Sequence, residues 1–201
     1  MISYIIIILI AYFLGNISTS TILAKKVYGV DISTQGSGNP GSTNVLRTLG
    51  KKAGAMTFAG DLWKGLMAVL IARVIAFYTG IDEVTAAYIA VVSVVSGHNW
   101  PVSLGFKGGK GVATSLGAMI GMNPVIALSC FGVFLIIVAI TKYVSLGSVV
   151  GISISPIIMF VLNNSKGVLV TLFLTASVIY THRENIKRLL NGTERKIGSK
   201  K

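Results

Sequence analysis

The chain has 201 residues, of which 53% are hydrophobic and only 12% are charged, and its mean hydropathy is +0.78. A soluble domain carries about 25% charged residues, so this chain cannot cover itself with a polar surface, and lipid is its expected solvent. The formal charge is +12, but the basic residues lie between apolar runs, which favours a membrane topology and anionic ligands over a nucleic-acid surface. The single cysteine, Cys130, excludes a disulfide framework within one chain.

The apolar runs predict an all-α, polytopic membrane protein with about seven transmembrane helices in one domain, residues 1–201. A break at 121–124 divides one overlong run, and Pro156 is expected to kink the sixth span. No basic residue precedes the first run, so we expect a retained span and not a cleaved signal peptide. The expected spans are 2–24, 55–78, 84–96, 112–121, 124–141, 145–162 and 168–181.

Basic residues concentrate on one side of this predicted topology. Of the 18 Lys and Arg residues, fifteen fall in the connections after spans one, three and five and in the C-terminal tail. The opposite side has only Lys166, beside Asp82 and Glu83. Cytoplasmic connections carry the excess of Lys and Arg, so the pattern predicts a cytoplasmic C-terminus and an N-terminus outside.

The polar stretch Gly97–Thr114, GHNWPVSLGFKGGKGVAT, is rich in glycine and carries two lysines. Glycine N–H groups at Gly108 and Gly109 can approach an anion closely, and Lys107 and Lys110 add positive charge beside them. The pattern suggests a phosphate site, and it equally suits a flexible basic connection between two helices. A Walker A loop is excluded, because glycine follows Lys110 where that motif requires Ser or Thr.

An earlier polar stretch, 28–54, contains GSGNPGSTNVLRTLGKKAG. Gly36–Gly41 formally fits GxGxxG, but a membrane chain of this kind has no room for the parallel sheet of a dinucleotide fold. A solvated loop with a helix cap at Ser42 or Thr43 is one interpretation of the segment. The other is a phosphate site built from donors and an arginine, namely Ser37, Asn39, Asn44 and Arg47.

Two later segments carry further polar candidates. Ser145 and Ser148 fall at the expected start of the sixth span, where free N–H groups favour anions and where ordinary N-capping would also place serine. In the tail, His182 and Asn185 are three residues apart and share a helical face, which suits a base or a hydrogen-bond donor. An amphipathic helix lying on anionic lipid heads is the alternative for this tail.

Ionisable residues inside the second span suggest either structural support or a transport pathway. Asp61 and Lys64 are three residues apart, and their burial in lipid would be costly, so we expect them to pair or to face the protein interior. Together with Arg73 they also suggest a small anion transporter, although no paired inverted repeat is visible. His98 is interpreted as a structural residue at the membrane interface. The histidines, Cys130 and acids lack ligand spacing, so no metal or other cofactor is expected.

Three segments in this order, 36–54, 97–114 and 182–194, resemble the bacterial acyl-phosphate:glycerol-3-phosphate acyltransferase family, PlsY, over essentially the full chain. The resemblance implies a monomeric enzyme of the bacterial inner membrane with its active site at the cytoplasmic face. Its expected partners are membrane lipids, acyl phosphate and glycerol 3-phosphate, with no nucleic acid. The implied reaction moves a fatty acyl group from acyl phosphate to the 1-hydroxyl of glycerol 3-phosphate, giving lysophosphatidic acid and phosphate for phospholipid synthesis.

The resemblance also implies which residues act. Family motif positions fall on Ser37, Arg47, Lys110, Ser145, His182, Asn185 and Glu194. No His is followed five residues later by Asp, so the HX4D motif of other acyltransferases is absent.

Acyl phosphate is already activated, so the site needs charge neutralisation, positioning and exclusion of water more than a nucleophile. Our hypothesis is that Arg47, Lys110 and the loop N–H groups hold phosphates, with substrate phosphate as a possible base. Glu194 is expected to anchor the tail to the basic loops, and the four polar segments are expected to converge at one lipid–water boundary. The residues expected to orient the acceptor hydroxyl or the acyl carbonyl are Ser37, Ser145, His182 and Asn185. A non-catalytic lipid-binding scaffold remains a third alternative.

Overall fold

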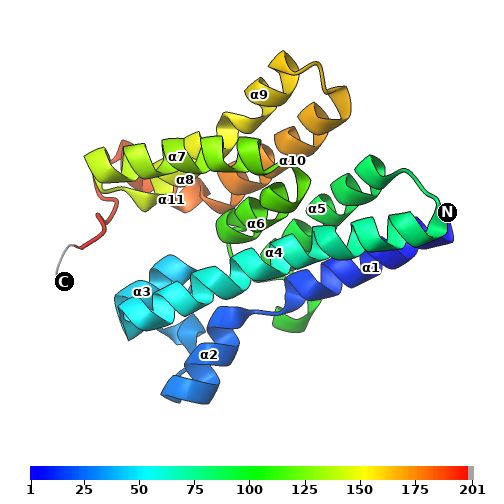
Figure 1. Ribbon diagram of the computed structural model, residues 1–201. Helices are drawn as coiled ribbons and strands as arrows, with labels where there is room; N and C mark the ends of the chain where they lie inside the picture. Colours follow the sequence, from blue (N-terminus) through cyan, green and yellow to red (C-terminus); the bar gives the residue numbers. More distant parts are fainter. Residues whose placement is uncertain (199–201) are drawn as a thin grey trace. The chain divides into compact units, whose positions relative to one another are not determined.

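The structure is a computed structural model that describes residues 1–198, and these residues form helices without any strand (Figure 1). They divide into two compact units, unit 1 from Met1 to Met122 and unit 2 from Asn123 onward. Lys200 and Lys201, counted above toward the basic face, lie outside the described residues. Unit 1 contains α1 (Ile2–Asn16), α2 (Thr19–Tyr28), the 3-10 turn η1 (Ile32–Thr34), α3 (Ser42–Leu49), α4 (Lys51–Thr79), α5 (Glu83–Asn99), η2 (Val102–Leu104) and α6 (Val112–Met122).

The long helix α4 is the centre of unit 1, and it packs against α1, α5 and α6 (Figure 1). Lipid supplies no hydrophobic drive for helix association, so helices in a membrane depend on close packing. Small residues allow these helices to approach closely enough for it. A side chain at Gly65 would meet the backbone of Thr114 in α6, and one at Gly117 would meet the carbonyl of Leu62 in α4. The backbones of α4 and α6 are therefore in direct contact, with a glycine of each helix lying against the backbone of the other.

A break in the first apolar run is the main departure from the expected spans. We expected one span over 2–24, but α1 ends at Asn16 and α2 begins at Thr19. Ser18 is the N-cap of α2, where its hydroxyl accepts from the N–H of Thr21 at 3.4 Å. Local capping and a distant partner described below thus interrupt the helix inside the run, although the stretch 2–28 as a whole is long and apolar enough for the expected first span.

Unit 2 consists of α7 (Pro124–Thr141), α8 (Val144–Ser153), α9 (Ser155–Val161), α10 (Ser165–Thr181) and α11 (Arg183–Leu190). α7 packs against α8, and α10 packs against α8 and α9. The bounds of α7 match the expected span because Asn123 caps it, accepting from the N–H groups of Val125 and Ile126, and a proline starts its first turn. The kink expected at Pro156 is an interruption at Ile154, between α8 and α9.

Four helical stretches are long and apolar enough to cross a membrane, namely 2–28, 51–79, 124–141 and 144–161. Two shorter apolar helices, α6 and α10, add to them. Large side chains on these helices stay exposed, including Phe77, Ile140 and Phe160, which suits contact with lipid. The integral membrane class is confirmed in this coarse form, whereas seven spans and the orientation of the termini stay predictions.

Candidate active site

The glycine- and serine-rich loop before α3 is held in shape by one amide side chain. Asn44 is buried in α3, where its Nδ2 donates to the carbonyl of Gln35 at 2.9 Å and its Oδ1 accepts the N–H of Ser37 at 2.9 Å. A side chain at Gly36 would collide with this amide, so the tight turn requires glycine there. The helix begins at Ser42 with Gly41 as its N-cap, so the cap at Ser42 or Thr43 that one interpretation of the segment offered is not formed.

Within this loop the candidate residues differ in exposure. Ser37 and Arg47 are exposed, and Asn39 is partly buried. Both ends of the Asn44 amide bind backbone groups of the loop. Asn44 therefore fixes the conformation of the loop and, with it, the position of Ser37. Direct phosphate contact by Asn39, Asn44 and Arg47 stays a prediction.

The second glycine-rich loop folds back onto the end of α5. The N–H of Gly108 donates to the carbonyl of Asn99 at 3.2 Å, and the N–H of Gly109 donates to the carbonyl of His98 at 3.1 Å. Gly109 lies against the His98 ring, because a side chain there would overlap Nε2. These two N–H groups thus have carbonyl partners in this structure, and their expected contact with phosphate stays a prediction. Lys110 follows, half-buried, just before α6 begins.

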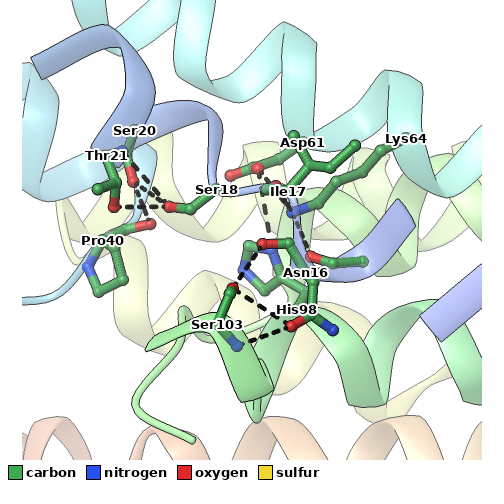
Figure 2. Close-up of polar contacts among 11 residues, drawn as sticks. Asn16, Ile17, Ser18, Ser20, Thr21, Pro40, Asp61, Lys64, His98 and Ser103 are labelled. Carbon is green, nitrogen blue, oxygen red and sulfur yellow. Dashed lines mark hydrogen bonds and ion pairs between the residues drawn. The ribbon is translucent and has the colours of Figure 1, made fainter. Parts of the chain in front are cut away.

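A buried charged cluster lies beside the break between α1 and α2 (Figure 2). Lys64 Nζ lies 3.2 Å from Asp61 Oδ1 and donates to the carbonyls of Gly15 at 3.0 Å and Ile17 at 2.7 Å. His98 Nδ1 lies 3.8 Å from the same Asp61 oxygen. The expected pairing of Asp61 with Lys64 is confirmed, and both side chains are buried. His98 is also buried and belongs to this cluster, while its expected position at the membrane interface stays a prediction.

Several polar partners around this cluster were not predicted from the sequence. The Asn16 side chain donates to the carbonyl of Tyr12 at 3.0 Å and accepts the N–H of Ser103 at 3.2 Å. The Ser20 hydroxyl donates to the carbonyl of Pro40 at 2.8 Å, which joins α2 to the loop before α3. The run of polar residues from 16 to 21 inside an apolar segment was the available signal.

In unit 2, one carboxylate binds two candidate residues and one arginine. Glu194 Oε1 accepts from the Ser145 hydroxyl at 2.8 Å and from Asn185 Nδ2 at 2.7 Å, while Oε2 accepts from Arg188 Nε at 2.8 Å. Ser145 is in the first turn of α8, as expected, but it binds this carboxylate instead of capping the helix. The described partners of Glu194 thus lie in α8 and α11.

The remaining two candidates of unit 2 both hydrogen-bond with the backbone. The Ser148 hydroxyl donates to the carbonyl of Val144 at 2.8 Å, so toward an anion it can offer only its lone pairs. His182 is buried, and its Nδ1 lies 2.9 Å from the carbonyl of Val178. A carbonyl accepts, so the neutral ring carries its proton on Nδ1 and keeps Nε2 as its acceptor.

The pKa of the Glu194 carboxyl reflects two opposing effects. Burial raises the pKa. The hydrogen bonds from Asn185, Arg188 and Ser145 together lower it by more than burial raises it, so the pKa lies below its ordinary value of 4.5. The ionised form therefore stabilises the folded chain above about pH 4.5, and that stabilisation is lost as the pH falls through the lower, folded-state pKa.

Known proteins are similar in sequence to nearly the whole of this chain. Residues 5–192 match the family described as Glycerol-3-phosphate acyltransferase. A protein of that name from Clostridioides difficile is 70% identical over 199 residues, covering 99% of this chain and 98% of the relative. One from Alkaliphilus metalliredigens is 47% identical, covering 97% and 96%.

Two solved structures also resemble this chain over nearly its whole length. A crystal structure of PlsY, described as an integral membrane glycerol 3-phosphate acyltransferase in its glycerol 3-phosphate form, is 41% identical with a TM-score of 0.89. It covers 98% of this chain, and this chain covers 96% of it. The lysophosphatidic acid form of PlsY gives a TM-score of 0.85 over the same coverage.

We expect Glu194→Gln to lower stability at neutral pH by about 1–3 kcal/mol, because charge-assisted hydrogen bonds to a buried acceptor are weakened. The gap between wild type and variant should begin to shrink as the pH drops below about 4.5, where the carboxyl of the unfolded chain takes up a proton, and should close as the pH falls through the lower pKa of the folded state. Thermal unfolding in detergent, measured from about pH 7 to about pH 3.5, checks this. Glu184→Gln, at an exposed position of α11, is the control. A gap that stays constant over this range would contradict the assignment.

Proposed function

This chain belongs to the glycerol-3-phosphate acyltransferase family, and on that premise we propose that it acylates glycerol 3-phosphate with acyl phosphate as the donor. The products are 1-acyl-glycerol 3-phosphate (lysophosphatidic acid) and phosphate, the first acylation of phospholipid synthesis. The observation that carries the proposal is the likeness over nearly the whole chain to PlsY structures described as glycerol 3-phosphate and lysophosphatidic acid forms.

The proposed step is one acyl transfer. The 1-hydroxyl oxygen of glycerol 3-phosphate attacks the acyl carbonyl carbon, an ester C–O bond forms, and the bond from that carbon to the phosphate oxygen breaks. Phosphate leaves with the electron pair, and the hydroxyl proton passes to a phosphate oxygen. Such chemistry relies on positioning and charge neutralisation more than on a protein nucleophile, in keeping with the basic residues of this chain.

In unit 1 we assign phosphate binding to Arg47 and Lys110. Arg47 offers a planar fork of donors that matches phosphate oxygens, and Lys110 offers a compact charge. The loop before α3 is held to α2 by the Ser20 hydroxyl, and the loop before α6 is held to the end of α5 by the bond from the Gly109 N–H to the His98 carbonyl. Ser37, presented by Asn44, is the hydroxyl that we assign to orienting substrate.

In unit 2 we assign orientation of the acceptor hydroxyl or the acyl carbonyl to Ser145, His182 and Asn185. The support is that Glu194 fixes two of them through hydrogen bonds of 2.7 and 2.8 Å. The Nδ1 contact of His182 with a carbonyl favours the tautomer whose Nε2 accepts from a substrate hydroxyl. Glu194 is then a support residue that holds the polar groups around it.

For location, we propose a single multi-pass domain in the bacterial cytoplasmic membrane that functions as a monomer. The asymmetry of Lys and Arg supports seven spans with the N-terminus outside and the four polar segments in the cytoplasm.

This topology predicts that cysteines introduced at 40, 110 and 190 react with a membrane-impermeant reagent only from the cytoplasmic side. The measurement uses intact cells and inverted vesicles, in a Cys130→Ala background that removes the native thiol. A cysteine at 166 serves as the control and should react from outside. Labelling of 40, 110 and 190 from different sides would contradict the proposed topology.

The donor proposal predicts that purified protein in detergent forms lysophosphatidic acid from acyl phosphate and glycerol 3-phosphate, and not from acyl-CoA in a parallel reaction. A transporter would require sealed vesicles for any signal, and a lipid-binding scaffold would give no product in either format. Mass spectrometry of the product separates the three. Product from acyl-CoA alone would overturn the donor assignment and leave the family membership intact.

The phosphate assignment predicts that Lys110→Ala lowers kcat/KM by about 100-fold or more, the effect of removing one fixed charge from a developing anion. Lys107→Ala is a matched control, because it removes an exposed lysine from the same loop and should stay within about threefold of wild type, as exposed charges contribute little. Steady-state rates at several glycerol 3-phosphate concentrations provide the measurement. Near-normal transfer by Lys110→Ala would remove the central residue from the proposed mechanism.

A further inference from the structure

The loop that carries Ser37 is held by side chains of two helices. Asn44 of α3 binds the first half of the loop, at the carbonyl of Gln35 and the N–H of Ser37. Ser20 of α2 binds the second half, because its hydroxyl donates to the carbonyl of Pro40 at 2.8 Å. Ser20 is only 1% exposed, so this hydroxyl depends on partners within the protein.

Three hydroxyl groups at the start of α2 form a chain that ends at the Pro40 carbonyl (Figure 2). Ser18 Oγ lies 2.8 Å from Thr21 Oγ1 and 3.1 Å from Ser20 Oγ. A carbonyl only accepts, so the single hydroxyl proton of Ser20 points to Pro40, and Ser20 accepts from Ser18. Ser18 in turn accepts from the Thr21 hydroxyl. Hydrogen bonds in such a chain polarise one another, which strengthens the bond to Pro40.

The start of α2 is itself held to the long helix α4. Lys64 of α4 donates to the carbonyl of Ile17 at 2.7 Å, directly before Ser18. The surface of α4 also lies close against the first turn of α2, because a side chain at Gly60 would overlap Thr19. The hydroxyl chain therefore starts in a fixed part of unit 1 and ends in the glycine-rich loop.

The part of the loop next to Pro40 has a flexible backbone. Gly38 has a φ of +70°, a left-handed conformation that glycine adopts at no steric cost and can also leave easily. Asn39, one of the candidate phosphate ligands, lies between Gly38 and Pro40. Release of the Pro40 carbonyl would let Gly38 and Asn39 move, while Asn44 still held the N–H of Ser37.

We propose that Ser20 is a positioning residue for acyl transfer, which places Asn39 and the nearby Ser37 by holding the Pro40 carbonyl. It contacts no substrate in this role. The inference rests on the proposed function in taking this loop as part of the substrate site. A hydroxyl that contributed only to stability would make the same bond, so the experiment measures loop placement and substrate binding separately from stability.

Ser20→Ala removes the hydroxyl and fits the space that serine occupies. We expect the KM for glycerol 3-phosphate or for the acyl donor to rise about three- to tenfold, the usual order for one lost hydrogen bond, while kcat changes less. Ser153→Ala is the matched control, because it removes a hydroxyl that donates to a carbonyl at 2.7 Å within α8, and its kinetic constants should match those of wild type. If Ser20→Ala does not fold, Ser20→Cys keeps the shape, offers only a weakly donating thiol and should raise the same KM.

Loop placement can be measured without any substrate. A cysteine introduced at 39, in the Cys130→Ala background, takes a partly buried position. Ser20→Ala should raise the rate at which this cysteine reacts with a thiol reagent in detergent by about threefold or more, because the released loop opens more often. A cysteine at 166, an exposed position of α10, is the control and should react at the same rate with and without Ser20→Ala.

Wild type is assayed in parallel with both acyl donors. If it makes no product from acyl phosphate, the donor proposal fails, and the KM comparison proceeds with the donor that it does use. If neither donor gives product, the proposed function fails, whereas the reaction rate at 39 still tests whether Ser20 holds the loop.

Two results would each overturn the positioning role in an active enzyme. The first is an unchanged reaction rate at 39, which would show that the loop keeps its place without the Ser20 hydroxyl. The second is a folded Ser20 variant that keeps both KM values and has only a lower yield or a lower unfolding temperature, which would make Ser20 structural alone.

Discussion

A helix end that is buried away from water must still have its carbonyl groups hydrogen-bonded, because no water is present to donate to them. The end of α1 meets this condition through Lys64, which binds the carbonyls of Gly15 and Ile17 from the side of α4. The ammonium is itself acceptable there only because Asp61 lies 3.2 Å away. The redirection of the chain into α2, and with it the anchoring of the loop before α3, depends on this buried pair.

Composition and capping residues predicted most helices but could not predict that break. The span 124–141 was predicted with its observed bounds, since Asn and Pro at its start act locally. The stop at Asn16 was missed because the donor that completes it is 47 residues away from Ile17, in another helix. Ser18, the N-cap of α2, is a local mark of the break, but periodicity and capping patterns report only neighbours along the chain and could not identify Lys64 as the donor to the end of α1.

The same distinction between local and distant information applies to the candidate site. The polar segments could be found from the sequence, and the place of Ser145 in the first turn of α8 was expected, but the carboxylate partner of Ser145 lies 49 residues further on. Asn44 was grouped with the possible phosphate ligands because it is polar and lies in a glycine-rich segment. Only the folded loop shows that both ends of its amide bind the backbone of Gln35 and Ser37.

Glu194 lies after every group that it binds, following Ser145 by 49 positions and Asn185 by nine. During translation, Ser145 is therefore made 49 residues before its acceptor, and Asn185 nine residues before it. The Ser145 hydroxyl has no carboxylate partner until the chain has been extended to residue 194. Completion of the polar arrangement is thus one of the last events of biosynthesis, and a nascent chain released before residue 194 would insert into the membrane without it.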